Sequence, residues 1–295
     1  MTSEVPIQIT VGVLALQGAF SEHLQLLRLA STLLLSSPIP TFSNTTWTFL
    51  EVRTPAQLST CDAHILPGGE STTMSLVASS SHLLQPLRSF VKEARRPVWG
   101  TCAGLILLAE SANRTKATGQ ELIGGLDVRV NRNHFGRQVE SFEADLELPF
   151  LDDSRTGNGE GEAGKGRMFR SVFIRAPVVE SLLAPAEGVQ AEQERREDTV
   201  VAPSLRPVDE SASEAKGRGG VEILARLPGR ARALKDKNTT ARDLGEEGDI
   251  VAVRQGNVFG TSFHPELTGD ERIHVWWLEQ VVEAVRKRRA VEEQV

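Results

Sequence analysis

The feature that most constrains this chain is a repeated unit, in which a short apolar strand is followed by a glycine turn and then a helix. Strands are expected at Ile7–Leu16, Ala63–Leu66 and Pro97–Gly100, because these segments are apolar and short. Each precedes a glycine-containing turn and a helical pattern of apolar residues. Alternating strands and helices predict an α/β fold with a mostly parallel sheet, which binds ligands beyond the carboxyl ends of its strands.

The second half of the chain predicts shorter strands and a long final helix. Gly256-Asn257 is expected to form a hairpin turn, and a helix from about Gly269 carries an apolar stripe that includes Trp276 and Trp277. The further strands are expected at Val128–Val130, Phe142–Leu148, Phe173–Arg175, Val221–Leu224 and Ile250–Val253.

Four polar stretches interrupt these patterns and are expected to be flexible insertions in a single domain that spans residues 7–285. A tail at 286–295 begins with the basic run Arg286–Arg289, whose charges complement the dipole of a helix end. The expected insertions are at 36–48, 152–166, 185–220 and 228–248.

Charge and composition exclude several classes of protein. The 295 residues include 33 Lys and Arg against 39 Asp and Glu, a net charge of −6, so nucleic acid is not expected as a partner. The sequence has neither a signal peptide nor a run of about 18 apolar residues, which predicts no membrane association. The two cysteines are too few for a disulfide framework or a zinc site, and indicate thiols in the cytoplasm.

The strongest chemical signal is Gly100-Thr101-Cys102-Ala103-Gly104, which has the spacing of a nucleophile elbow with cysteine as the nucleophile. Glycine on both sides permits a sharp turn, and the amino end of the helix from Ala103 favours a thiolate. The alternative is that Cys102 is a small buried hydrophobic residue, as most unpaired cysteines are.

A nucleophile of this kind needs a base, and the base needs a group that orients it. His264-Pro265-Glu266 supplies both, because residues two apart in an extended segment project from the same face. A histidine beside a capping acid is the simpler interpretation of this tripeptide alone. The other histidines have no such neighbour and are expected in the core or on the surface: His23, His64, His82, His134 and His274.

The stretch Leu66-Pro67-Gly68-Gly69-Glu70-Ser71 follows another expected strand. Its glycines would leave backbone N–H groups free to stabilise a developing oxyanion, although Pro-Gly-Gly is also common in ordinary turns.

These motifs occur within longer blocks by which the chain resembles the glutaminase subunits of pyridoxal 5′-phosphate synthase, a family of class I (triad) glutamine amidotransferases. The blocks extend over nearly the whole chain: VGVLALQGAFSEH from Val11, ILPGGESTTM from Ile65, GTCAGLILLAE from Gly100, RNHFGRQVESFEADL from Arg132, FIRAP from Phe173 and VAVRQGNVFGTSFHPELT from Val251.

The resemblance implies a flavodoxin-like, three-layer α/β domain and a set of site residues. Catalysis is assigned to Cys102, His264 and Glu266, and the oxyanion site and interface to Gln17, Gly69 and Ala103. Contacts to glutamine are assigned to Gly68, Gly69, Glu70, Arg132, Ile174 and Arg175. An Arg fork suits the carboxylate of an amino acid, and Glu70 suits its ammonium group.

The resemblance also implies that L-glutamine is hydrolysed to glutamate and ammonia. The ammonia would pass to a synthase subunit in a large heteromeric complex that makes pyridoxal 5′-phosphate, and the glutaminase itself would need no metal or cofactor. Two alternatives stay open: a cysteine hydrolase that uses the same elbow, and a non-catalytic interaction subunit.

Overall fold

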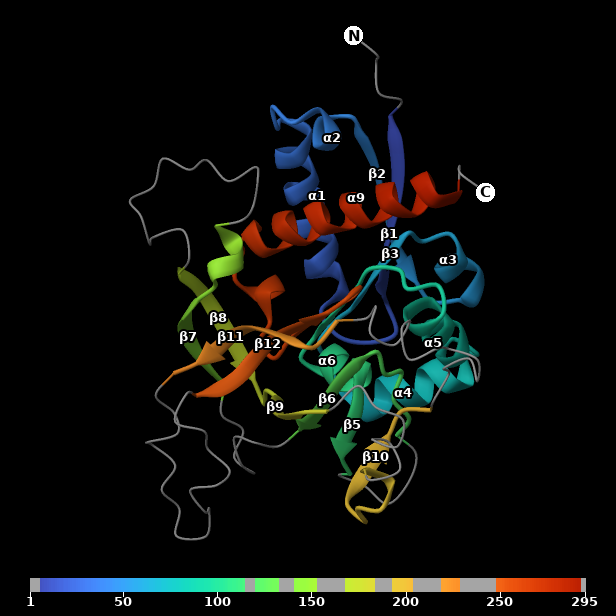
Figure 1. Cartoon of the computed structure of the whole chain (residues 1–295), viewed down its shortest axis with the longest axis vertical. Coiled ribbons are helices and arrows are strands. Elements are labelled where there is room, and N and C mark those ends of the chain that lie inside the picture. Colours follow the sequence, from blue (N-terminus) through green and yellow to red (C-terminus); the bar gives the residue numbers. More distant parts are fainter. Residues whose placement is uncertain are drawn as a thin grey trace.

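The centre of the molecule is an eleven-stranded mixed sheet (Figure 1). The structure is a computed structural model, which describes residues 6–114, 120–132, 141–152, 168–183, 193–203, 219–228 and 248–292. Its strand order is β10-β5-β6-β9-β12-β13-β4-β3-β1-β2, and β11 pairs with β12 outside this path. The strands are β1 (Ile7–Leu14), β2 (Thr45–Val52), β3 (Ala63–Leu66), β4 (Val98–Thr101), β5 (Ala109–Asn113), β6 (Leu126–Asn131), β9 (Val178–Leu182), β10 (Thr199–Val201), β11 (Glu222–Leu227), β12 (Asp249–Gln255) and β13 (Val258–Thr261).

The half of the sheet that carries the predicted motifs is parallel. Strands β13, β4, β3, β1 and β2 are neighbours in this order, and every pairing among them is parallel. In the register, Gly100 of β4 lies opposite both Leu66 of β3 and Gly260 of β13. The carboxyl ends of these three strands therefore meet at one edge, where the segments after Leu66, Thr101 and Thr261 begin.

The other half of the sheet is mainly antiparallel. Strands β12 and β13 form the predicted hairpin, with Gln255 opposite Val258 across the Gly256-Asn257 turn. A separate two-stranded sheet consists of β7 (Ser141–Glu147) and β8 (Met168–Ile174). The prediction of one α/β domain with a mostly parallel central sheet is confirmed, and the antiparallel pairings described here make that sheet mixed.

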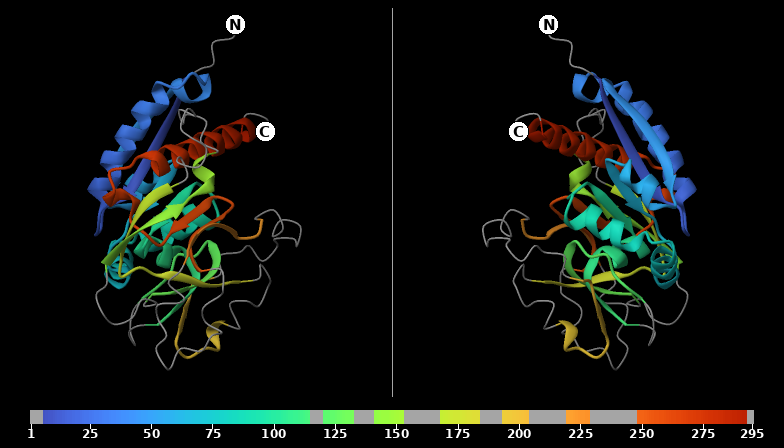
Figure 2. Two further views of the ribbon diagram at one scale, coloured as in Figure 1. Left: turned by 90° about the vertical axis from the view of Figure 1, so that its left-hand side faces the viewer. Right: turned by 90° about the vertical axis from the view of Figure 1, so that its right-hand side faces the viewer.

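Helices cover both faces of the parallel strands and produce three layers. Strand β1 shows why, since Val11 and Val13 join the hydrophobic cluster of α1 (Phe20–Leu35) and α9 (Arg272–Glu292), whereas Leu14 joins the cluster on the opposite face. Figure 1 shows α9 lying across α1, and α1 forms an outer edge of the molecule in Figure 2. The opposite face carries α3 (Pro55–Ser59), α4 (Ser71–Ser80), α5 (Leu84–Lys92) and α6 (Ala103–Leu108).

The structure has regular elements at 36–48, where a flexible insertion was expected. This segment contains helix α2 (Pro40–Ser43), in which Phe42 is buried, and the first residues of β2, which pairs with β1 over its whole length. The Ser, Thr and Pro content of this segment is typical of a loop, which is why an insertion was expected. However, threonine favours strands, and an edge strand needs only one apolar face.

The other expected insertions lie largely outside the described residues. Of the stretches 152–166 and 228–248, the structure describes only Asp152, Pro228 and Gly248. Within 185–220, residues 193–203 are described and include β10, which pairs with β5. This strand and β9 were not predicted, although Val178 and Val179 of β9 are buried.

The expected C-terminal tail is helical up to Glu292, because α9 continues through the basic run. Arg288 forms an ion pair with Asp62, Arg286 donates a hydrogen bond to Thr41, and Arg289 donates one to the carbonyl of Gln8. These contacts attach the end of α9 to the β1–β3 region. In the part of the chain that the structure describes, no helix is both long and apolar enough to cross a membrane.

Candidate active site

Cys102 lies at a sharp turn between β4 and α6, with φ +48° and ψ −100°. This backbone conformation is unfavourable for any residue with a side chain. The two flanking glycines permit the close packing around it. A Cβ on Gly104 would lie 2.0 Å from the carbonyl oxygen of Leu66, and one on Gly100 would lie 2.5 Å from the carbonyl carbon of Gly104. The sharp turn predicted from the glycine spacing is thus present.

His264 and Glu266 lie at the end of the neighbouring strand. The Nδ1 atom of His264 is 2.7 Å from Oε1 of Glu266, and both side chains are buried. Thr101 and Thr261 are paired across β4 and β13, and the N–H of Cys102 donates to the carbonyl of Thr261 at 2.8 Å. The elbow and the His-Pro-Glu segment therefore start from adjacent positions of the sheet.

The electrostatics of these three side chains are coupled. Burial favours the neutral form of His264, but the Cys102 side chain and the Glu266 carboxylate outweigh it and raise the pKa of His264 to about 10. Burial likewise raises the pKa of Glu266, whereas His23 and His264 lower it, and the net direction is down. The buried carboxylate of Glu266 therefore holds the His264 imidazole in its protonated form.

The Pro-Gly-Gly turn lies directly against the imidazole. A Cβ on Gly68 would be 2.1 Å from Cε1 of His264, so only glycine permits this contact. Gln17 approaches from the turn after β1, and its Oε1 accepts a hydrogen bond from the N–H of Glu70 at 3.1 Å. Ala103 is the first residue of α6, and its N–H therefore has no partner within the helix.

Glu70 and Arg132 carry opposite charges at the same end of the sheet, near enough for the charge of Glu70 to affect the pKa of Arg132. The Glu70 carboxylate caps α4 by accepting hydrogen bonds from Thr72 and Thr73. Despite the opposing effect of burial, these bonds lower the pKa of Glu70 to about 2. Burial lowers the pKa of Arg132 to about 10, and the charge of Glu70 opposes this shift.

The guanidinium of Arg132 has free donors. Its Nη1 donates to Oε1 of Gln120, whereas its buried Nε and Nη2 have no hydrogen-bond partner among the described residues. Two unused donors of a buried fork match the two oxygens of a carboxylate, and the ionised Glu70 nearby matches an ammonium group. This pair has the chemistry to bind an α-amino acid.

Ile174 and Arg175 reach the site from β8. The carbonyl oxygen of Ile174 lies 3.8 Å from Sγ of Cys102. Arg175 follows with φ +47°, and its side chain is exposed. The structure thus brings the Ile174 backbone to the thiol, whereas the Arg175 side chain lies at the surface.

Sequence reasoning did not find two histidines that lie behind the triad. His23 and His274 are fully buried, and Nε2 of His23 is 3.4 Å from Oε2 of Glu266. His23 lies in the block LQGAFSEH, but its partners are distant in the sequence. Neighbour spacing could not reveal them.

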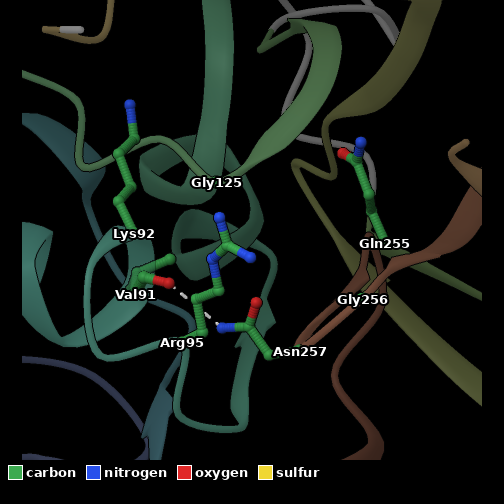
Figure 3. Close-up of a pocket in the computed structure, with 7 residues that line it drawn as sticks. All are labelled: Val91, Lys92, Arg95, Gly125, Gln255, Gly256 and Asn257. Carbon is green, nitrogen blue, oxygen red and sulfur yellow. Dashed lines mark hydrogen bonds between the residues drawn. The ribbon is translucent and has the colours of Figure 1, made fainter. Parts of the chain in front are cut away.

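A cavity of about 150 Å³ lies elsewhere, between α5 and the β12–β13 turn (Figure 3). Its polar groups are already engaged, since Lys92 pairs with Glu110 and Asn257 donates to the carbonyls of Val91 and Arg96. None of the predicted site residues lines it. Among the described residues, no three His, Cys, Asp or Glu side chains form a metal-binding group.

The comparisons with known proteins agree with the fold and motifs. The model of the SNO glutamine amidotransferase family matches residues 13–206 and 220–283. The chain is 38% identical to a probable pyridoxal 5′-phosphate synthase subunit PDX2 of Arabidopsis thaliana, over 93% of this chain and 86% of that protein. It is 36% identical to the pyridoxal 5′-phosphate synthase subunit PdxT of Herpetosiphon aurantiacus, over 91% and 98% respectively.

A solved structure of a glutamine amidotransferase has a TM-score of 0.56 to this one. The two are 34% identical, and the match covers 92% of this chain and 98% of the other. With a family match that extends over most of its length, this chain belongs to the SNO glutamine amidotransferase family.

Proposed function

We propose that this chain is the glutaminase subunit of a pyridoxal 5′-phosphate synthase and that Cys102, His264 and Glu266 carry out the hydrolysis of L-glutamine. The observation that carries the proposal is the buried thiol at the elbow beside an imidazole whose pKa is raised to about 10. The names of the relatives, which are subunits of that synthase, supply the pathway.

Acylation begins with attack of the Cys102 thiolate on the side-chain amide carbon of glutamine. The backbone N–H groups of Gly69 and Ala103 stabilise the oxyanion that forms. The His264 imidazolium gives its Nε2 proton to the departing nitrogen, the C–N bond breaks, and ammonia leaves. A γ-glutamyl thioester remains on Cys102.

Deacylation uses the same groups in reverse. Neutral His264 takes a proton from water, which attacks the thioester carbon, and the C–S bond breaks to release glutamate. The enzyme returns to its thiolate and imidazolium forms. Throughout the cycle, Glu266 keeps Nδ1 of His264 protonated, so that Nε2 faces the reaction.

Substrate selection follows from the charges near the elbow. Nε and Nη2 of Arg132 bind the α-carboxylate, and the Glu70 carboxylate binds the α-ammonium. Gly68 lies against the His264 ring, the Ile174 carbonyl lies 3.8 Å from the thiol, and we assign Arg175, which follows Ile174, to a glutamine contact as well. Gln17 fixes the N–H of Glu70 and thereby holds the glycine turn in place.

The partner in this proposal is the synthase subunit, which receives the ammonia within a heteromeric complex. Its binding orients the oxyanion donors, and this explains why the family is expected to depend on its partner for full activity.

A cytoplasmic location is proposed from the two unpaired thiols, Cys61 and Cys102, and is tested by cell fractionation.

The deciding experiment measures ammonia and glutamate formed from glutamine, with and without the synthase subunit. Cys102→Ala should abolish both products and leave binding of the synthase intact. Cys61→Ala is the matched control, because burial raises the pKa of Cys61 to about 12 and keeps that thiol protonated. Glutaminase activity retained in Cys102→Ala would refute the mechanism.

The same assay separates the alternatives. A cysteine hydrolase would cleave a peptide or another amide and leave glutamine intact. A non-catalytic interaction subunit would bind the synthase without any turnover in the wild type.

A further inference from the structure

A chain of buried polar side chains continues behind the triad. Nε2 of His23 on α1 lies 3.4 Å from Oε2 of Glu266 and 3.3 Å from Oγ1 of Thr101. The other ring nitrogen of His23, Nδ1, lies 3.0 Å from Nε2 of His274 on α9. Helices α1 and α9 pack against each other, which brings these two histidines together (Figure 1).

Each oxygen of the Glu266 carboxylate thus faces a different imidazole. Oε1 is bound to His264, and Nε2 of His23 lies 3.4 Å from Oε2. The His23 contact is long for a hydrogen bond, and Oε2 has no well-formed partner among the described residues. A buried carboxylate oxygen without such a partner is costly, so this contact matters for the orientation of Glu266.

The Glu266 carboxylate determines the tautomer of both histidines. Two oxygens face Nε2 of His23, Oγ1 of Thr101 at 3.3 Å and the carboxylate Oε2 of Glu266 at 3.4 Å. Because the carboxylate can only accept, we place the proton of His23 on Nε2, which leaves Nδ1 as an acceptor. Nε2 of His274 must then donate to it, and Nδ1 of His274 keeps a lone pair. This Nδ1 has no hydrogen-bond partner among the described residues, and an unpaired acceptor costs less than an unpaired buried N–H. The opposite tautomers would place two lone pairs against each other at Glu266.

We propose that His23, with its tautomer held by His274, is a positioning residue that holds Glu266 and thereby keeps His264 aligned with Cys102. This inference rests on the proposed glutaminase function and adds two residues to its machinery. Neither histidine touches the substrate or the reacting atoms.

The titratable groups that face His23 are Glu266, His274 and His264. Burial is the largest influence and lowers the pKa of His23 to about 3, although Glu266 opposes it. Burial also lowers the pKa of His274 to about 3. Both rings are therefore neutral where the enzyme works, and His23 acts through one N–H donor and not through a charge.

Two amide substitutions separate this role from simple packing. In His23→Gln the amide nitrogen reaches the position of Nε2 and can still donate to Glu266. In His23→Asn it reaches only the position of Nδ1, on the side of His274. Both variants remove a buried ring and retain an amide, but the glutamine amide can keep the contact to Glu266, whereas the asparagine amide can keep only the contact to His274.

The assay is glutamine hydrolysis by the complete complex with the synthase subunit. His23→Gln should keep kcat within about threefold of wild type, whereas His23→Asn should lose about 10- to 100-fold in kcat with KM nearly unchanged. His64→Asn is the control for a lost buried imidazole, because His64 packs against Phe90 on the opposite face of the sheet. Equal kcat values for the two His23 variants, both folded, would overturn the proposal.

A second readout does not depend on glutamine. The rate at which iodoacetamide alkylates Cys102 at pH 7 should fall by roughly threefold to tenfold in His23→Asn, since a misaligned Glu266 stabilises the imidazolium and thiolate less. It should stay near the wild-type rate in His23→Gln. This result separates the two hypotheses, because a wild type that fails to hydrolyse glutamine would contradict only the proposed function.

A third measurement needs no substitution at His23. In the wild-type chain labelled with ¹⁵N-histidine, the ring signals should show His23 neutral at pH 7 with its proton on Nε2. The ring signals that disappear in either His23 variant are those of His23. If neither variant folds, His274→Gln identifies the signals of His274 and so helps to assign those of His23. A proton on Nδ1 of His23 would overturn the proposal.

Discussion

At the residue scale, two residues other than glycine adopt positive φ values where the site is built. Cys102 has φ +48° and Arg175 has φ +47°. The carbonyl of Ile174, which precedes Arg175, lies 3.8 Å from the Cys102 thiol. Such conformations cost about 1 to 3 kcal/mol and persist only where the surroundings enforce them. The elbow therefore costs stability in order to place the buried Cys102 thiol beside the His264 segment and the Ile174 carbonyl.

This strain predicts that Cys102→Gly is more stable than Cys102→Ala by about 1 kcal/mol, since glycine adopts positive φ without a steric penalty. Both variants lose the same thiol and should have no activity, which makes them a matched pair. Urea unfolding monitored by circular dichroism gives the difference. An alanine variant as stable as the glycine variant would show that the turn is unstrained.

Arg132→Lys should raise KM for glutamine by roughly 10- to 100-fold with a smaller effect on kcat, because a charged hydrogen bond is worth about 1.5 to 3 kcal/mol. Lysine keeps the charge but loses the two donors that match a carboxylate. Steady-state kinetics with glutamine, and with an analogue that lacks the α-carboxylate, measure the effect. The analogue should not distinguish Arg132→Lys from wild type, and an equal loss for both compounds would contradict the assignment.

The sequence predicted the proximity of the elbow and the His-Pro-Glu segment because each follows a strand of the same sheet. It did not predict His23 and His274, whose rings are 251 positions apart in the sequence and meet only when α1 packs on α9. Gln120, which accepts a hydrogen bond from Arg132, was missed for a similar reason, since it follows no strand and belongs to no recognisable motif.

At the element scale, the position of Cys102 depends on how closely α6 approaches β3. Gly104→Ala should destabilise the fold by about 1 to 3 kcal/mol and reduce activity, because its methyl group would meet the backbone carbonyl of Leu66, which cannot move aside. Unfolding and glutaminase assays measure the two effects.

Gly220→Ala is the matched control for that substitution. A Cβ on Gly220 would meet nothing within 4 Å, and its φ is not positive, so stability should stay within about 0.5 kcal/mol of wild type. If Gly104→Ala were equally harmless, the close contact between α6 and β3 would not position the elbow.

The elements that the sequence predicted well are those buried on both faces. Ala63–Leu66 is β3 to the residue, because a fully buried strand is a continuous apolar run. The elements that it missed are partly exposed or short. Strand β2 alternates apolar and polar residues at the sheet edge, and β5 follows α6 without a turn, so its start carries no signal.

At the scale of the whole molecule, the three layers fix the distance between segments that are far apart in the sequence. The parallel pairing of β3, β4 and β13 carries the glycine turn, the thiol and the imidazole to one edge. Helix α9 then closes the fold from the C-terminal side, and its basic end contacts β1 and Asp62. Catalysis and folding thus depend on the same sheet.

Three fully buried histidines make the folded state sensitive to acid. Burial lowers the pKa values of His23, His64 and His274 from 6.5 to about 3, so the unfolded chain binds their protons first as the pH falls. Stability should therefore fall between pH 6.5 and 3, by roughly 2 kcal/mol per histidine at pH 5. Replacing His64 with leucine should reduce the slope of unfolding free energy against pH in this range by about one proton. An unchanged slope would show that His64 is not buried as a neutral ring.

The most direct test of the central claim is covalent labelling with a diazoketone analogue of glutamine, followed by peptide mass spectrometry of the complex with its synthase subunit. The account predicts a single label on Cys102, slower labelling when glutamine is present, and no label on Cys61. Labelling of Cys61, or labelling of Cys102 at a rate that glutamine does not change, would contradict the assignment of Cys102 as the nucleophile of a glutaminase.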